Sequence, residues 1–133
     1  MRKAIALSVF ALSISGCATS MNVTRGTMVP AAKAKAKAKL DSNKNAIVTM
    51  EVERLANPKN LTPPQAFYLV WAQTDTGKTL PLGQLRVDDE GEASFTGTVA
   101  ANKFRLMVTA EAVASVDKPS ATVVLSTTMV EVD

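Results

Sequence analysis

The sequence of 133 residues contains no histidine and a single cysteine, and these two shortages exclude several kinds of site. Zinc sites are built from sets of Cys and His side chains, so a site of that kind is not expected. A serine nucleophile needs a positioned base. Without histidine only a Ser–Lys pair is left, and no spacing in the sequence indicates one. We therefore expect no enzyme, no metal ion and no cofactor.

Aromatic residues are also scarce, with one Trp, one Tyr and four Phe in the chain. Trp71, with Tyr68 near it in sequence, is a candidate binding residue that could stack on a sugar or a peptide. The alternative is that Trp71 is a large aromatic side chain filling the protein core. Acidic residues crowd together at 88–92, whereas calcium loops place their oxygen ligands at alternating positions. This segment therefore predicts a solvated turn.

No apolar run in the N-terminal region is long enough to span a bilayer as a helix. The run from residue 4 to about residue 14 has about eleven residues, whereas a spanning helix needs roughly twenty. Arg2 and Lys3 precede the run and small residues follow it, which is the pattern of an export signal. We expect residues 1–16 to be a signal peptide that is removed.

The tetrapeptide Ile14-Ser15-Gly16-Cys17 resembles the lipobox of bacterial lipoproteins. The resemblance implies that signal peptidase recognises Ile14, Ser15 and Gly16, and that Cys17 carries a diacylglycerol thioether as the acylated first residue. One acyl chain binds membranes only marginally, but two or three give lasting attachment. The alternative is an ordinary buried or free cysteine. In a Gram-negative host, Ala18 in place of aspartate implies by the same resemblance the outer membrane, facing the periplasm.

Charge in the remaining 117 residues is nearly balanced, with 13 basic and 12 acidic side chains, although the precursor has a net charge of +3. Residues 18–60 hold eight basic and three acidic side chains, and residues 61–133 hold five and nine. Nucleic-acid binding requires clustered positive charge that is not neutralised locally. We expect no nucleic-acid partner in an exported protein, and keep attraction to anionic lipid headgroups as an alternative use of the lysines.

The segment KAKAKAKL at residues 33–40 alternates lysine and alanine. A period of two places like residues on one face of a strand, whereas a helix would scatter them around its axis. Alanine and lysine are good helix formers, so propensity and pattern disagree. The turn-rich stretch DSNKN at 41–45 and the alternating segment AIVTMEVERL at 46–55 follow. Together the three segments predict a β-hairpin.

Folding this hairpin about its loop places Lys33 opposite Glu53 and Lys35 opposite Glu51, while alanines face larger apolar residues. Opposite charges across a strand pair contribute on the order of 0.2 to 1 kcal/mol each. Lysines also suit an edge strand, where charge discourages pairing with other chains. The alternatives for residues 33–40 are a helix and a disordered basic arm.

Several details of the remaining chain bear on its architecture. The segment FYLVWAQT is apolar on both faces, as expected of a strand that is covered on both sides. Pro81 and Gly83 predict an edge strand or a bulge. Glu111 is expected at a strand end exposed to water. Residues 18–32 show no sustained period, and we predict a flexible tether over this segment.

The whole pattern predicts an all-β fold without a helix. The expected architecture is a single seven-stranded antiparallel β-sandwich of immunoglobulin-like size over residues 33–133, behind the signal peptide of 1–16 and a lipidated, flexible segment of 17–32. The seven predicted strands lie at 33–40, 46–55, 67–74, 80–87, 93–99, 103–113 and 122–132.

A set of short motifs between about residues 46 and 130 resembles the C-terminal extracytoplasmic domain of anti-sigma-K factors and related bacterial exported proteins. The residues that carry the resemblance are Tyr68, Val70 and Trp71 in one strand, Gly77, the pair Leu82-Gly83, Gly91, the run Val108 to Glu111, and the pair Pro119-Ser120. Complete anti-sigma factors also carry a cytoplasmic sigma-binding domain and a transmembrane helix. This sequence has no counterpart of either, so inhibition of a sigma factor is not implied.

These observations together predict a lipid-anchored, non-enzymatic protein of the cell envelope. Its partners would be the membrane, through the lipid on Cys17, and an envelope protein or polymer, with a signalling or structural accessory role. The alternative is a small-ligand or carbohydrate-binding module. Exposed aromatic side chains at Trp71 and Tyr68 would distinguish that alternative.

Overall fold

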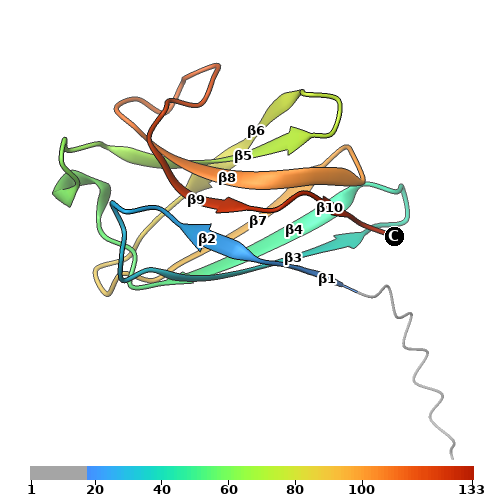
Figure 1. Ribbon diagram of the computed structural model, residues 1–133, viewed down its shortest axis with the longest axis horizontal. Coiled ribbons are helices and arrows are strands. Elements are labelled where there is room, and N and C mark those ends of the chain that lie inside the picture. Colours follow the sequence, from blue (N-terminus) through green and yellow to red (C-terminus); the bar gives the residue numbers. More distant parts are fainter. Residues whose placement is uncertain (1–17) are drawn as a thin grey trace, which may run out of the picture.

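The computed structural model describes residues 18–133, which form two antiparallel β-sheets packed face to face (Figure 1). The four-stranded sheet contains, in spatial order, β1 (Thr19–Met21), β3 (Lys33–Leu40), β4 (Ala46–Glu53) and β7 (Ala93–Val99). The six-stranded sheet contains, in order, β2 (Val23–Arg25), β9 (Val123–Thr127), β8 (Lys103–Glu111), β5 (Phe67–Thr74) and β6 (Thr79–Leu85), with β10 (Val130–Glu131) also beside β8. The predicted all-β sandwich is confirmed.

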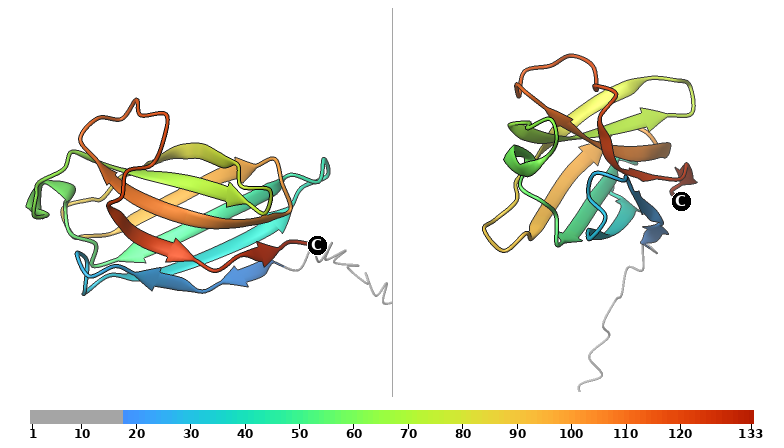
Figure 2. Two further views of the ribbon diagram at one scale, coloured as in Figure 1. Left: turned by 45° about the horizontal axis from the view of Figure 1, so that its top comes forward. Right: turned by 60° about the vertical axis from the view of Figure 1, so that its left-hand side comes forward.

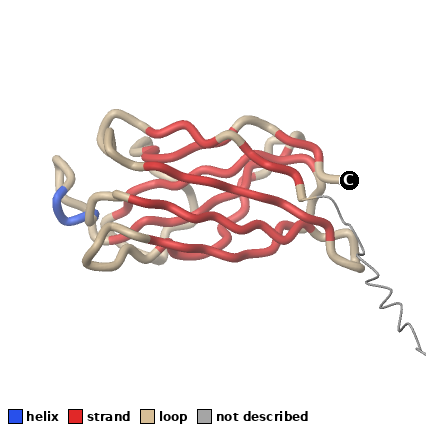
Figure 3. Tube along the Cα trace, turned by 90° about the horizontal axis from the view of Figure 1, so that it is seen from below, coloured by secondary structure: helices blue, strands red, loops and turns tan. Residues whose placement is uncertain are grey.

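Strands run along the length of the molecule, and turns gather at its two ends (Figure 3). The described residues contain one short helical segment, the 3-10 turn η1 (Pro58–Asn60), in the connection between β4 and β5. The described strands number ten rather than the predicted seven. The additional ones are β1, β2 and the separate short β10.

The hairpin of β3 and β4 has the register that the alternation predicts. All eight residue pairs match, including Lys33 with Glu53 and Lys35 with Glu51. The lysines of β3 are exposed, whereas Ala36 and Ala38 are buried. The two alternative predictions for residues 33–40, a helix and a disordered basic arm, are therefore wrong. The period of two decides the structure here because one face of each strand is buried against the other sheet.

Aspartates organise two of the tight turns. Asp41 Oδ1 accepts hydrogen bonds from the amides of Asn43 at 2.8 Å and Asn45 at 3.0 Å in the β3–β4 turn. Asp88 Oδ1 accepts two amide hydrogen bonds in the same manner at 88–92, where Gly91 has a φ of +80°. Short polar side chains of this kind are typical of turns. The acidic run is therefore a turn, as predicted.

Residues 18–32 differ from the predicted flexible tether. β1 pairs with β3 and β2 pairs with β9, so the chain joins one sheet and then the other. Met21, Val29 and Ala32 are buried, and Gly26 N donates a hydrogen bond to Val124 O at 2.7 Å. The prediction of a flexible tether is therefore wrong for these residues. The sequence did not indicate the two strands because each has only three residues, too few to show a period of two.

The strand β6 forms one edge of the six-stranded sheet, as Pro81 and Gly83 predict. Its pairing with β5 shifts register between Val70 and Trp71, which marks a β-bulge. Gly83 has a φ of +153°, and a Cβ atom there would lie 3.0 Å from the ring of Phe95. Glycine thus permits both the backbone conformation and the close packing between the sheets.

The last strand of the prediction is interrupted. Both β9 and β10 pair with β8, and the chain leaves the sheet between them at Thr128 and Met129. At this break Thr127 Oγ1 accepts a hydrogen bond from Leu106 N at 2.8 Å and donates one to Thr128 O at 3.0 Å. The side chain therefore satisfies backbone groups that the strand pairing leaves free.

The core lies between the two sheets, and a second, smaller cluster lies outside it. The largest buried side chains between the sheets include Tyr68, Phe104, Met50, Leu85, Leu106 and Leu125. Leu69, Trp71 and Met107 form the second cluster, which also contacts Val116 of the β8–β9 loop. β5 is thus apolar on both faces because the β8–β9 loop covers its outer side (Figure 2).

Candidate functional site

The predicted lipidation site lies outside the described residues. This holds for Cys17 and for the proposed peptidase recognition residues Ile14, Ser15 and Gly16. Their roles remain predictions. The nearest described strand is β1, which begins at Thr19, two residues after the cysteine.

Trp71 does not present its ring to solvent. Its exposed fraction is 0%, and its indole Nε1 donates a hydrogen bond to Thr109 Oγ1 at 2.8 Å. The ring packs in the cluster beneath the β8–β9 loop rather than between the two sheets. The structure therefore does not support Trp71 as an exposed stacking platform. The alternative, burial in the protein core, is correct as to burial, but Trp71 lies in the outer cluster and not between the two sheets.

Tyr68 is also buried, on the opposite face of β5. Its hydroxyl donates a hydrogen bond to Ala56 O at 2.6 Å, and its exposed fraction is 1%. Burial raises the pKa of Tyr68 to about 12 because an apolar environment disfavours the phenolate. Tyr68 therefore fixes the β4–β5 connection to the core, and its ring is not available to a ligand in this conformation.

Glu111 is buried, although the sequence suggested an exposed strand end. Its exposed fraction is 5%, and its Oε2 accepts hydrogen bonds from Thr109 Oγ1 at 2.6 Å and from Ser120 N at 2.9 Å. Thr109 in turn accepts the hydrogen bond from Trp71. The sequence did not predict this polar network because Ser120 lies in the irregular β8–β9 loop, whose return toward β8 has no sequence pattern. The spacing of Thr109 and Glu111 on one face of β8 was the available signal.

A small hollow of about 230 Å³ lies beside Trp71. It lies between strands β5 and β6 and the β8–β9 loop, and its lining residues are Leu69, Val70, Trp71, Pro81, Gly83, Gln84, Ala114 and Val116. The lining is mostly apolar. No charged side chain is among these residues, so the hollow offers little to orient a polar ligand.

A larger cleft of about 400 Å³ lies at the side of the sandwich between β2 and the first residues of β3. Its lining residues are Val23, Arg25, Ala32, Lys33, Ala34, Lys35, Glu51, Glu53 and Leu125. The cleft exists because β1 pairs with β3 only at residues 36–38, which leaves residues 33–35 without a paired strand on that side. Its volume is within the range of small-ligand sites, which is about 300 to 1,000 Å³.

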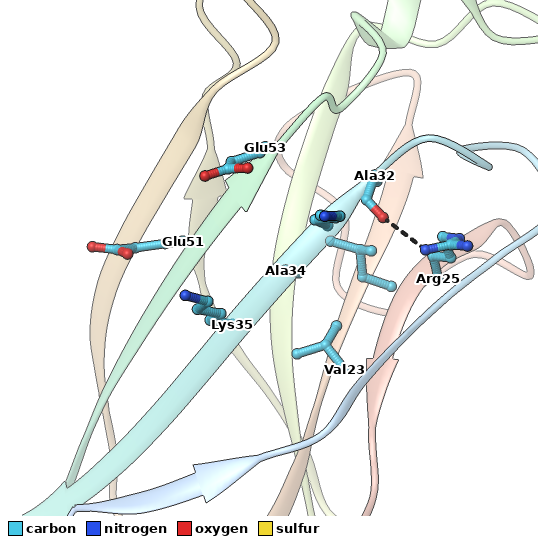
Figure 4. Close-up of a pocket in the computed structure, with 9 residues that line it drawn as sticks. Val23, Arg25, Ala32, Ala34, Lys35, Glu51 and Glu53 are labelled. Atoms are coloured by element: carbon cyan, nitrogen blue, oxygen red, sulfur yellow. Dashed lines mark hydrogen bonds between the residues drawn. The ribbon is translucent and has the colours of Figure 1, made fainter.

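Charged groups of both signs surround this cleft. Figure 4 shows Glu51 and Glu53 on one side of β3 and Arg25 on the other. Arg25 Nη1 donates a hydrogen bond to Ala32 O at 3.3 Å, which holds the guanidinium against the loop before β3. Val23 forms part of the apolar floor. The arrangement can bind a small group with both apolar and charged parts.

The outer surface of the four-stranded sheet is a second candidate surface, which we call the lysine face. Its exposed side chains are Ser20, Lys33, Lys35, Lys37, Lys39, Ile47, Thr49, Glu51, Glu53, Ser94, Thr96 and Thr98. Cross-strand register arranges them in rows, in which Lys37 lies beside Ser20 and Thr49, and Lys39 lies beside Ile47. Lysine is thus the main source of positive charge on this face.

Residues 18–133 contain neither a metal-binding cluster nor a membrane-spanning helix. No group of three or more His, Cys, Asp and Glu side chains there is placed to hold a metal ion. None of the helical structure in this part of the chain is long and apolar enough to cross a membrane.

No protein-family model, curated protein or solved structure matches the chain. The resemblance to the C-terminal domain of anti-sigma-K factors therefore depends on the short motifs alone. In the structure several of these motifs have structural roles. Tyr68 and Trp71 are buried, and Gly77 and Gly91 occupy turns with positive φ.

Proposed function

We propose that this chain is a lipid-anchored, non-enzymatic β-sandwich protein of the bacterial cell envelope. In this proposal the protein binds an envelope protein or polymer, or acts as a signalling or structural accessory. The observation that carries it is the lipobox-like sequence ending at Cys17, directly before a sandwich that begins at Thr19. The membrane, reached through the lipid on Cys17, is the first partner. In a Gram-negative host the location is the outer membrane.

The position of the first strand supports a rigid attachment. Because β1 starts two residues after Cys17, the acyl chains would be joined to a folded strand and not to a flexible tether. Successive Cα atoms are 3.8 Å apart, so the sandwich would be held within about 10 Å of the lipid. The folded surface near residue 19 would therefore face the membrane.

Replacement of the cysteine tests the lipid anchor. We expect Cys17→Ser to move the protein from the membrane fraction to the soluble fraction, and mass spectrometry of the wild type to show a diacylglyceryl modification on Cys17. Ser20→Ala, an exposed change on β1, is the matched control and should fractionate like the wild type. A Cys17→Ser protein that still sediments with membranes after washing would refute the anchor.

A small-ligand-binding module is the second candidate, and the cleft beside Arg25 favours it. Stacking on sugars is a weaker basis, because the side chains of Trp71 and Tyr68 are buried. The chain has a single tryptophan, so its fluorescence reports the exposure of Trp71 alone. Quenching by acrylamide should be weak in the folded protein. Quenching as strong as that of free tryptophan would show that Trp71 is exposed and would support its role in stacking on a ligand.

A further inference from the structure

The two halves of the lysine face differ in charge. In one half Lys33 lies opposite Glu53 and Lys35 lies opposite Glu51. In the other half the strand β4 offers no carboxylate, because Lys37 lies opposite Thr49 and Lys39 lies opposite Ile47. The next strand, β7, continues these rows with Thr96 and Thr98. Positive charge is therefore uncompensated across the strands in this half alone.

The uncompensated half is the one next to Thr19, where the first described strand begins. Thr19 pairs with Ala38, which lies between Lys37 and Lys39 in β3. β1 runs antiparallel to β3, so the chain before Thr19 leads toward Lys39 and the β3–β4 turn. Two residues of chain reach at most about 7 Å from the Cα atom of Thr19. The lipid would be attached beside these lysines.

An exposed apolar side chain accompanies the lysines. Ile47 is 38% exposed, in the row of Lys39 and Thr98. Lys44 of the β3–β4 turn is also exposed at this end. A group of cationic side chains around an apolar one suits the boundary between headgroups and acyl chains, where lysine stems lie along apolar material and the ammonium groups remain in water.

One carboxylate, that of Asp41, lies at this end of the four-stranded sheet, and Glu131 and Asp133 lie in or after a strand of the other sheet. The carboxylate of Asp41 accepts two amide hydrogen bonds within the β3–β4 turn. Glu131 is part of β10, which pairs with β8 in the six-stranded sheet, and Asp133 follows it. Lys37, Lys39 and Lys44 outnumber the one carboxylate of Asp41, so the charge at this end of the four-stranded sheet is positive.

We propose that the patch of Lys37, Lys39, Lys44 and Ile47 lies on the surface of a membrane that contains anionic phospholipids. This inference rests on the proposed lipid anchor and names the surface that the anchored domain presents. Each lysine near such a surface strengthens binding about fivefold, and the attraction declines over a Debye length of about 8 Å. The short link from the lipid keeps the patch close to the membrane surface.

The acylated protein in vesicles provides the test. A fluorophore is placed on the face by Thr49→Cys, and a matched one on the β8–β9 loop by Val113→Cys, where the native side chain is 54% exposed. In vesicles of phosphatidylcholine and phosphatidylglycerol, lipid with a nitroxide headgroup should quench the first label and not the second. The quenching should be lost in pure phosphatidylcholine and at high salt.

Two double variants with the same change of charge sharpen the test. Lys37→Gln/Lys39→Gln should shift the equilibrium between docked and undocked protein about 25-fold toward the undocked state, from two lysines at about fivefold each. Lys33→Gln/Lys35→Gln removes lysines that lie opposite carboxylates, and should shift it clearly less. Equal loss in both variants would overturn the proposed patch. Thermal unfolding would verify that both variants are folded.

The outcomes separate this proposal from the lipid anchor. Acylated protein that stays on the vesicles while both labels are quenched equally would keep the anchor and overturn the docking. Shielding of the label at position 49 only by added peptidoglycan fragments would also overturn it, in favour of a polymer partner. Absence of a lipid on Cys17 by mass would overturn both proposals.

Discussion

A buried carboxylate fixes the loop that covers Trp71. Glu111 accepts hydrogen bonds from Thr109 and from the amide of Ser120, and Trp71 donates to Thr109. Trp71, Thr109 and Glu111 are buried, and a buried donor without a partner costs about 1 to 3 kcal/mol. The network therefore links the six-stranded sheet to the β8–β9 loop through a single side chain.

Removal of this carboxylate should loosen the loop. Glu111→Ala is expected to lower the free energy of unfolding in urea by about 1 to 3 kcal/mol, because the Thr109 hydroxyl and the Ser120 amide lose their acceptor. It should also increase quenching of Trp71 by acrylamide. Glu92→Ala, at an exposed position, should change stability by no more than about 0.5 kcal/mol. Unchanged stability and unchanged quenching in Glu111→Ala would show that the network does not stabilise the β8–β9 loop.

Tyr68 gives a prediction that depends on pH. The chain has a single tyrosine, and burial raises its pKa from 10.0 to about 12. The ionised form is favoured in the unfolded state, so this group contributes stability below pH 10 that is lost as the pH rises toward 12. Absorbance at the phenolate wavelength should show titration near pH 12 in the folded protein. Titration near pH 10 without unfolding would contradict the buried position.

The hairpin of β3 and β4 separates the two faces of the four-stranded sheet residue by residue. Ala38 is 1% exposed and faces Val48 in the core, whereas its neighbour Lys37 is exposed on the lysine face. Alanine on the inner face leaves room for the larger side chains of β4. The four-stranded sheet is therefore charged on its outer face and closely packed on its inner face.

Introduction of a charge at adjacent positions tests this alternation. Ala38→Asp should destabilise the protein by about 3 to 5 kcal/mol or prevent folding, because the carboxylate would be buried without a partner. Lys37→Asp should alter the free energy of unfolding by only about 0.5 kcal/mol. Circular dichroism during urea titration measures both changes. Equal effects at the two positions would be inconsistent with a strand of period two.

Elements that depend on local pattern were predicted well from the sequence. The hairpin register is correct because its two strands and its turn are contiguous, and β6 is an edge strand as Pro81 indicated. The strands β1 and β2 were missed since each is short and pairs with a partner distant in sequence. The position of Trp71 outside the central core was missed for a similar reason, because the loop that covers it follows β8 and is distant from Trp71 in sequence.

The short N-terminal strands contribute to the core through Met21. This side chain is 4% exposed and belongs to the cluster between the sheets. Met21→Ala should therefore lower the free energy of unfolding by about 2 to 5 kcal/mol, as for other large-to-small changes in cores. Asn22→Ala, at the exposed junction of β1 and β2, should have little effect. A neutral Met21→Ala variant would indicate a tether.

The whole molecule is a sandwich that includes the chain from its first described strand. β1 closes one edge of the four-stranded sheet and β2 closes one edge of the six-stranded sheet, so the N-terminal segment joins both layers (Figure 2). A lipid on Cys17 would thus be attached to the folded body itself. The proposed orientation of the lysine face toward the membrane depends on this arrangement of β1 and β2.

Backbone amide hydrogen exchange over residues 19–25 tests this construction most directly. Amides that are hydrogen-bonded within β1 and β2 should exchange slowly, with protection comparable to that of their partners β3 and β9. Protection of this kind would establish that the sandwich begins next to the cysteine. Exchange at the rate of an unstructured peptide throughout residues 19–25 would contradict it, and with it the proposed orientation on the membrane.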